Sequence, residues 1–250
     1  MKLPLQNKTV LVTGGARRVG AAICRRLHAA GANVVIHYRA SAAAARALAK
    51  LLNATRKGSA ACVKADLLDE PTPRVLVAAC ITEFGRLDAL VNNASSFYAT
   101  PVGCINQRAW HDLMGTNLKA PLFIAQAAAR ELTKRRGCVV NIVDIHAEFP
   151  LKDYVIYTIA KGGLAALTRS LARELGPQVR VNGVSPGPIL WPDAGIWKSA
   201  KMRKNILDRT LLKRMGEPDD IARTVEFLIT SAPYVTGQII AVDGGRSIAL

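Results

Sequence analysis

The sequence predicts a single doubly wound α/β domain, in which helices cover both faces of a parallel β-sheet. Short apolar runs rich in β-branched residues alternate with longer helical patterns along the chain. A glycine-rich turn follows the first of these runs and leads into a helix. No linker, internal repeat or shift of composition marks a second domain, so we expect residues 1–250 to form one unit.

Each element follows from its local pattern. The runs are almost continuously apolar, as is typical of strands buried on both faces, and their alternation with helices implies right-handed crossovers between parallel strands. Alanine- and leucine-rich segments predict helices from about residue 20 to 30 and from 41 to about 54. The predicted strands are Thr9–Val12, Asn33–Tyr38, Ala60–Lys64, Ala89–Asn92, Cys138–Val143, Val179–Val184 and Gln238–Val242.

The composition is that of a protein with a large buried core. Of 250 residues, 50% are hydrophobic and the mean hydropathy is +0.16, which excludes a disordered chain. No apolar run reaches the roughly 20 residues of a membrane span, and residues 1–8 lack a signal-peptide core, so we expect a cytoplasmic protein. The five cysteines form no CxxC pair and the four histidines show no metal-ligand spacing, so we expect no structural metal.

The net charge of +16 leaves two interpretations open. A positive field attracts anionic ligands, including phosphorylated cofactors, and it also attracts nucleic acid. However, no five like charges follow one another and aromatic residues make up only 5%, so neither a basic arm nor a stacking platform is present. We therefore expect a basic surface and no nucleic-acid partner.

The first glycine-rich turn has the features of a phosphate-binding loop. It reads TGGARRVG at residues 13–20, between a predicted strand and a predicted helix. Gly14 and Gly15 permit a tight turn, and Gly20 permits close packing of the helix on the strand. The helix N-terminus then directs free N–H groups and its positive dipole end at a pyrophosphate.

The end of the second strand favours NADPH over NADH. An NAD site carries an acid there that accepts from the ribose 2′-hydroxyl, and the stretch Ile36–Ser41 contains no acid. Arg39, the Ser41 hydroxyl and Arg18 are instead suited to a 2′-phosphate. His37 and Tyr38 complete this predicted part of the cofactor site.

Downstream motifs supply candidate catalytic residues. Tyr157 and Lys161 are four residues apart and face the same side of a helix, where the ammonium group is expected to lower the tyrosine pKa from about 10. A Tyr–Lys pair at this spacing indicates a catalytic site only because it takes its place in an ordered series of motifs. The phosphate loop, Asn92–Ala94, Asn117, YxxxK and Ser185–Gly187 follow one another.

This ordered set resembles the short-chain dehydrogenase/reductase family over essentially the whole chain, which implies a Rossmann fold and a homotetramer. Asn117, Tyr157 and Lys161 match three members of the family's Asn-Ser-Tyr-Lys tetrad. The chain departs from the pattern twice: Arg18 replaces the middle glycine of TGxxxGxG, and Asp144 stands where the serine is expected, 13 residues before Tyr157.

Asp144 changes the chemistry that the site can perform. A serine hydroxyl donates to a carbonyl, whereas an ionised aspartate only accepts and would repel a developing alkoxide. A carboxylate suits a substrate with N–H donors or a ring nitrogen that is protonated as hydride arrives. The alternative is a solvated carboxylate at a strand end.

The same departure resembles the pteridine reductase branch of the family. Its arginine-containing loop, its NNASSFY segment at residues 92–98 and its Asp, Tyr and Lys are all present here. The resemblance implies that Phe97 stacks the pterin, and that Ser95 and Arg18 contact the pterin and the cofactor phosphates. The alternatives are a core aromatic for Phe97 and a solvent-facing side chain for Arg18.

The resemblance also completes the expected site. Asp66 would bind the adenine amino group, with a helix N-cap as the alternative role. Lys161 would hold the nicotinamide ribose, Tyr157 and Asp144 would relay the proton, and Asn117 would support a water chain. The remaining expected cofactor contacts are Gly14, Arg17, Val19, Asn93, Ala94, Pro186, Gly187 and Ile189.

The predicted function is therefore NADPH-dependent reduction of a dihydropterin of the biopterin or monapterin type, with folate as a further substrate. Residues 188–215 are expected to form a substrate lid, whose basic residues either attract an anionic substrate tail or form a solvated helical face. Carbonyl or 3-oxoacyl reduction on the same fold, a non-catalytic NADPH sensor and a nucleic-acid binder are the alternatives.

Overall fold

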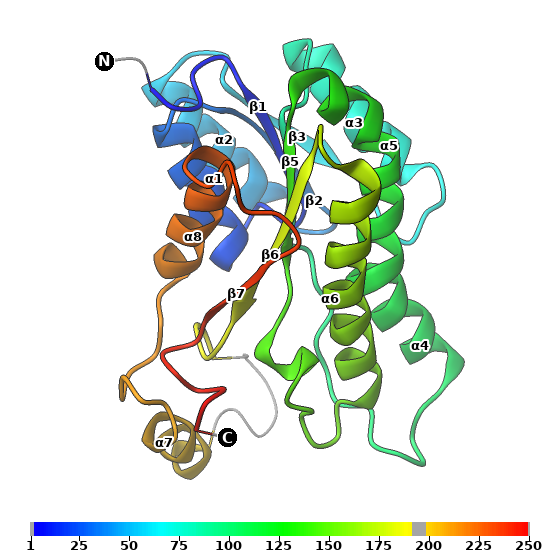
Figure 1. The fold of residues 1–250 in the computed structure, drawn as a ribbon, viewed down its shortest axis with the longest axis vertical. Helices are drawn as coiled ribbons and strands as arrows, with labels where there is room; N and C mark the ends of the chain where they lie inside the picture. The colour runs from blue at the N-terminus through cyan, green and yellow to red at the C-terminus, as the bar shows by residue number, and fades with distance from the viewer. Residues whose placement is uncertain (1–2, 192–198, 250) are drawn as a thin grey trace.

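The structure is a computed structural model that describes residues 3–191 and 199–249, and its centre is one parallel β-sheet (Figure 1). Seven strands pair in the order β3-β2-β1-β4-β5-β6-β7. This confirms the predicted doubly wound sheet, the Rossmann fold. The strands are β1 (Thr9–Val12), β2 (Asn33–Tyr38), β3 (Ala60–Lys64), β4 (Ala89–Asn92), β5 (Cys138–Ile142), β6 (Arg180–Pro186) and β7 (Ile239–Val242).

The helices form two layers (Figure 1). On one face lie α1 (Arg18–Ala29), α2 (Ala42–Thr55) and α8 (Pro218–Thr230). On the other lie α3 (Thr72–Phe84), α5 (Ala120–Arg135) and α6 (Val155–Leu175). The remaining helices are α4 (Gln107–Met114), the π-helical turn η1 (Gly115–Lys119), the 3-10 turn η2 (Ile145–Ala147) and α7 (Ala200–Asp208).

The strands face two hydrophobic cores because successive side chains point to opposite sides of a sheet. Val10 and Val12 belong to the core under α1, α2 and α8, whereas Leu11 belongs to the core under α3, α5 and α6. In β5, Val140 belongs to the first of these cores and Val139 to the second. Burial on both faces explains why the runs read as continuously apolar.

The predicted boundaries are correct for the first four strands and differ for the last three. β6 continues to Pro186 because Ser185 and Pro186 pair with Ala241 and Val242 of β7, a long-range contact that has no local signal. α1 begins at Arg18, two residues before the predicted start.

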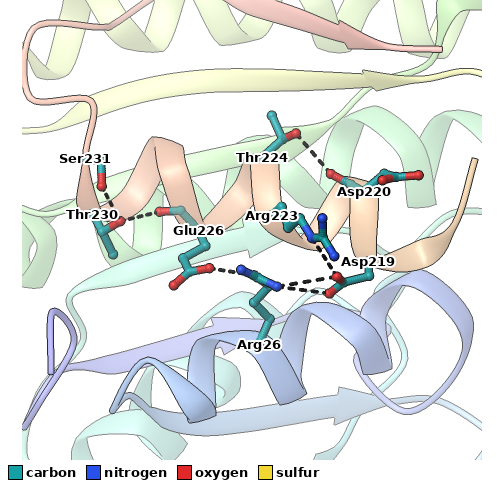
Figure 2. A network of polar contacts seen from close by, with 8 residues as sticks. All are labelled: Arg26, Asp219, Asp220, Arg223, Thr224, Glu226, Thr230 and Ser231. Carbon is teal, nitrogen blue, oxygen red and sulfur yellow. Dashed lines mark hydrogen bonds and ion pairs between the residues drawn. The ribbon is translucent and has the colours of Figure 1, made fainter. Parts of the chain in front are cut away.

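Charged side chains join α1 to α8, as Figure 2 shows. Arg26 donates from Nε to Glu226 (2.5 Å) and lies 3.4 Å from Asp219, which also accepts from Arg223 (2.7 Å). These groups are partly exposed, so each pair is worth no more than about 1 kcal/mol. Together they connect α1 to α8 through side chains at the surface.

The topology places a crevice at the carboxyl ends of β1 and β4. From β1 the chain proceeds to β2 and β3 in one direction, and from β4 it proceeds to β5, β6 and β7 in the other. Ligands bind at such a switch point in open α/β sheets. No helix in the described part of the chain combines the length and apolar character needed to cross a membrane.

Candidate active site

A cavity of about 790 Å³ opens at the carboxyl ends of β1, β4, β5 and β6. It gathers the predicted site residues from distant parts of the sequence, and all but Tyr38, Ser41 and Asn117 line it. Those that do are Gly14, Arg17, Arg18, Val19, His37, Arg39, Asp66, Asn93, Ala94, Ser95, Phe97, Asp144, Tyr157, Lys161, Pro186, Gly187 and Ile189.

The phosphate loop is held by the segment that follows β4. The Thr13 hydroxyl accepts from the backbone N–H groups of Asn93 (2.9 Å) and Ala94 (3.0 Å). The Asn93 side chain donates back to the carbonyls of Thr13 and Gly14. These reciprocal hydrogen bonds connect the chain just after β1 to the chain just after β4.

Two glycines in the loop are required by its geometry. Gly14 has a φ of +61°, in the left-handed region that glycine adopts without strain. A Cβ on Gly20 would lie 2.2 Å from the Gly14 carbonyl oxygen, so no side chain fits there. The loop therefore presents bare backbone in front of α1, whose first turn contains no acid. This donor set fits the pyrophosphate of a dinucleotide.

His37 braces the loop from β2. Its Nδ1 accepts from the Gly14 N–H (3.1 Å), so Nε2 carries the proton and donates to the Ala65 carbonyl (3.2 Å). Burial lowers the pKa of His37, which keeps the ring neutral in this role. His37, a predicted cofactor residue, thus supports the phosphate loop through a hydrogen bond from the loop backbone.

The end of β2 carries a cation beside two acids. The Arg39 guanidinium lies 4.0 Å from Asp66 and 4.0 Å from Asp112 of α4. Asp112 also accepts from the Ser96 hydroxyl (3.1 Å). Ser41 occupies the N-cap of α2, yet its side chain makes no capping hydrogen bond. Sequence reasoning missed Asp112, because a helical acid far from the motifs has no distinguishing local pattern.

Asp66 is not the N-cap of the following helix. That position belongs to Pro71, and the Asp66 carboxylate accepts instead from the Leu68 N–H (3.0 Å) in the turn before α3. The N-cap interpretation is therefore wrong. Asp66 lines the cavity near Arg39, and its role in binding adenine stays a prediction.

Asp144 and Tyr157 form a hydrogen-bonded pair. The Tyr157 hydroxyl donates to Asp144 Oδ2 (2.7 Å), while Oδ1 accepts from the His146 N–H (2.9 Å) at the N-cap of η2. Tyr157 is only 4% exposed. Burial raises the pKa of Tyr157 well above its usual value, the Asp144 carboxylate raises it further, and the Ser95 side chain partly opposes them.

The expected effect of Lys161 on Tyr157 is wrong in this structure. Lys161 Nζ donates to the Ile142 carbonyl (2.9 Å) and lies 5.7 Å from the Tyr157 ring centroid, and burial together with Asp144 controls the tyrosine pKa. Burial also lowers the pKa of Lys161 to about 8, which Asp144 opposes. The two side chains share one face of α6, as predicted, but burial has the largest effect on the pKa of each, and Asp144 the second largest.

Asn117 lies in the π-helical turn η1 and is fully buried. Its amide donates to the carbonyls of Ser96 (3.0 Å) and Leu113 (2.9 Å), and its Oδ1 accepts from the Ser95 hydroxyl (2.6 Å). The side chain therefore orders the Ser95–Ser96 backbone. A π-helical turn is frequent at functional sites.

Phe97 packs against other aromatic rings and also faces the cavity, so its core contacts are confirmed and pterin stacking stays a prediction. Its ring stacks on Tyr154 (centroids 4.6 Å apart, planes at 21°) and meets the Tyr157 ring edge-on (4.8 Å, 79°). It packs on a small core with Leu113 and Ile156, and it also lines the cavity. The ring is thus a half-buried wall of the cavity beside Tyr157.

Arg18 connects the phosphate loop to the opposite rim of the cavity. Its Nη2 donates to the carbonyls of Leu190 and Trp191 (both 3.2 Å). The backbone φ of Arg18 is +51°, which explains why a glycine is expected at this position. The side chain is exposed, so it faces solvent as the alternative expects, but it also reaches across the cavity to these carbonyls, and its contact with the cofactor phosphates stays a prediction.

The predicted lid lies partly outside the described residues, which omit 192–198 and with them Lys198. Within the described part, Pro188, Ile189 and α7 line the cavity. Met202, Asn205 and Ile206 are the residues of α7 that do so, and they fall within the predicted lid. Sequence reasoning missed the loop 151–153 and Arg246, which also line the cavity. Tertiary contacts bring these residues to the cavity, and no local motif marks them.

Comparison with known proteins identifies the family. A family model described as Enoyl-(Acyl carrier protein) reductase matches residues 14–247. The chain belongs to the short-chain dehydrogenase/reductase family and is an oxidoreductase. The family implies a nicotinamide cofactor.

Individual relatives span nearly the whole chain. Pteridine reductase 1 of Leishmania tarentolae is 38% identical, covering 95% of this chain and 96% of the relative. An uncharacterized oxidoreductase of Methylorubrum extorquens is 35% identical, covering 96% and 98%. The 3-oxoacyl-acyl-carrier-protein reductase FabG of Staphylococcus aureus is 33% identical, with the same coverage of 96% and 98%.

Proposed function

We propose that this protein is an NADPH-dependent pteridine reductase that converts dihydropterins to tetrahydropterins, with folates as a second substrate class. The observation that carries the proposal is the 2.7 Å hydrogen bond between Tyr157 and Asp144. It places an acceptor-only carboxylate beside the proton donor, where reduction of a ketone would develop negative charge. The 38% identity to a pteridine reductase supports the same choice.

The proposed reaction adds a hydride to a ring carbon and a proton to the adjacent ring nitrogen, so that C=N becomes CH–NH. NADPH, when bound, supplies the hydride. Tyr157 holds the proton at its hydroxyl oxygen, since burial and Asp144 both raise its pKa. Asp144 accepts from substrate N–H groups and shares the Tyr157 proton, which solvent replaces after transfer. Phe97 orients the flat ring beside this pair.

The proposed preference for NADPH depends on the charge beside β2. Arg39 and the N-terminus of α2 offer positive charge, and Ser41 offers a hydroxyl with no capping bond. The Ile36–Ser41 stretch contains no acidic residue that would repel a 2′-phosphate. We also propose a homotetramer, the assembly that the family resemblance implies.

The similarity to 3-oxoacyl reductases makes ketone reduction the second candidate. Oxidation of NADPH should be measured with dihydrobiopterin, dihydromonapterin, dihydrofolate and a 3-oxoacyl thioester side by side. We expect the pteridines to be reduced and the thioester to be inert or nearly so. Faster turnover of the thioester than of every pteridine would contradict the proposal.

A further inference from the structure

The C-terminal segment brings an arginine to the end of the cavity beside α7. Arg246 lines the cavity together with Met202, Asn205 and Ile206. Its Nη1 donates to the Ile206 carbonyl (3.2 Å). A guanidinium has five N–H donors, so one carbonyl leaves most of them for other acceptors.

Arg246 and Arg209 have no carboxylate partner in the part of the chain that the structure describes. Burial lowers the pKa of Arg246, and the nearby Arg209 lowers it further, because two like charges oppose each other. The adjacent Asp243 uses its carboxylate on the N–H groups of Gly245 and Ser247.

The surrounding sequence strengthens this charge. Residues 200–216 contain six basic residues and one acid, Asp208. Asp208 is already paired with Lys204 (3.0 Å), and of the other basic residues Arg214 lies 3.8 Å from Asp220. A half-buried arginine without a counter-ion is unfavourable in the free protein and becomes favourable when an anion binds.

The strand order separates Arg246 from the residues expected to bind the cofactor phosphates. Arg246 follows β7, whereas the phosphate loop follows β1 and Arg39 follows β2. Four strand spacings separate β7 from β1, and five separate it from β2. At about 4.8 Å per strand these separations are roughly 19 and 24 Å. Arg246 instead follows Asp243, which packs closely against Gly187 just after β6.

We propose that Arg246, with Arg209 beside it, binds an anionic group on the substrate's tail, a carboxylate or a phosphate. The inference rests on the proposed function and narrows its substrate class: pteridines with a charged tail bind through this subsite, and neutral dihydropterins do not use it. A bidentate guanidinium contact suits both kinds of anion.

Steady-state kinetics with three pteridines test the subsite. We expect Arg246→Gln to raise the KM for dihydrofolate about tenfold, the effect of losing one hydrogen bond to a charged group. The KM for neutral dihydrobiopterin should stay unchanged. Dihydroneopterin monophosphate tests whether the subsite binds a phosphate as well as a carboxylate. Arg246→Lys should recover part of the dihydrofolate KM.

The matched control is Arg130→Gln on α5, which removes the same charge from an exposed helix on the other side of the sheet. It should change neither KM. If Arg246→Gln leaves the KM ratio of charged to neutral substrates unchanged, Arg246 only tethers the C-terminal segment to α7, and the inference is overturned while pteridine reduction stands.

A binding measurement separates this failure from failure of the proposed function. The probe is 4-aminobenzoylglutamate, a charged tail without a pteridine ring, titrated into the NADPH-loaded protein. If the wild type reduces no pteridine, weaker probe binding by Arg246→Gln than by the wild type still supports the subsite. Equal binding, or no binding to the wild type, overturns it.

Discussion

Removing the charge of Asp144 should separate pteridine chemistry from carbonyl chemistry. Asp144→Asn keeps the shape and an oxygen that can accept from the His146 N–H (2.9 Å in the native protein). It removes the carboxylate that accepts from Tyr157 at 2.7 Å. Asp144→Ser restores the hydroxyl that is expected in the family tetrad and shortens the side chain.

The size of the effect follows from this geometry. A hydrogen bond to a charged group contributes about 1.5–3 kcal/mol, or roughly 10- to 150-fold in rate if it is lost in the transition state. Asp144 is also proposed to share the transferred proton. We therefore expect both variants to lower pteridine turnover by about 10²- to 10⁴-fold, the usual range for a positioned acid–base group. The KM for NADPH should hardly change.

The pH profile gives a second, independent readout. Tyr157 donates only when it is protonated, and Lys161 carries positive charge only below its pKa of about 8. Asp144 raises the pKa of both groups. Removing its charge lowers both pKa values, so the fall in kcat at high pH should begin at a lower pH in Asp144→Asn than in the wild type.

The assay is NADPH oxidation with dihydrobiopterin across pH, followed by a ketone and an aldehyde at the best pH. The serine variant should gain weak carbonyl reduction, since its hydroxyl can donate to a carbonyl oxygen. Wild-type rates of dihydropterin reduction by Asp144→Ser would refute the catalytic role of the aspartate. An unshifted basic limb in Asp144→Asn would refute the electrostatic account of Tyr157.

Three further substitutions test the cofactor and substrate sites. The wild type should prefer NADPH over NADH by at least about tenfold in kcat/KM, and Arg39→Asp should erode that ratio; equal use of both cofactors by the wild type would contradict the assignment. Phe97→Ala should raise the pterin KM by the equivalent of about 1–3 kcal/mol without changing the KM for NADPH, and an unchanged pterin KM would reduce Phe97 to a core residue. Arg18→Gly should relieve the φ of +51° and leave the thermal unfolding midpoint no lower than that of the wild type, while it raises the KM for NADPH; an unchanged KM would remove Arg18 from the cofactor site.

The fold was predictable because its signals are local and repeated. Strands buried on both faces read as apolar runs, and the turn at residues 13–20 identified the first strand end. The bounds of β1 to β4 follow from those runs alone. The extension of β6 did not, because it depends on pairing with β7 more than fifty residues later.

The site residues that belong to ordered motifs were predictable from the sequence. Those that reach the cavity only through tertiary packing were not. Asp144, Tyr157 and Lys161 lie together as the spacing indicated, yet the spacing misjudged which charge controls Tyr157. Burial determines that balance, and burial has no signature in a four-residue motif. Asp112 and Arg246 reach the cavity through α4 and the C-terminal segment, which only the folded chain brings there.

Asp144 shows how one substitution can change the chemistry of a site without disturbing its scaffold. The residue must cap η2 through the His146 N–H, and it must also meet Tyr157. A serine hydroxyl has one oxygen and can cap the turn in the same way, but it would then face Tyr157 with the same atom. A carboxylate has two oxygens, so one caps the turn while the other accepts from the phenol. The cap fixes the orientation of Oδ2 before any substrate binds, and the acceptor it presents favours a substrate that offers N–H groups.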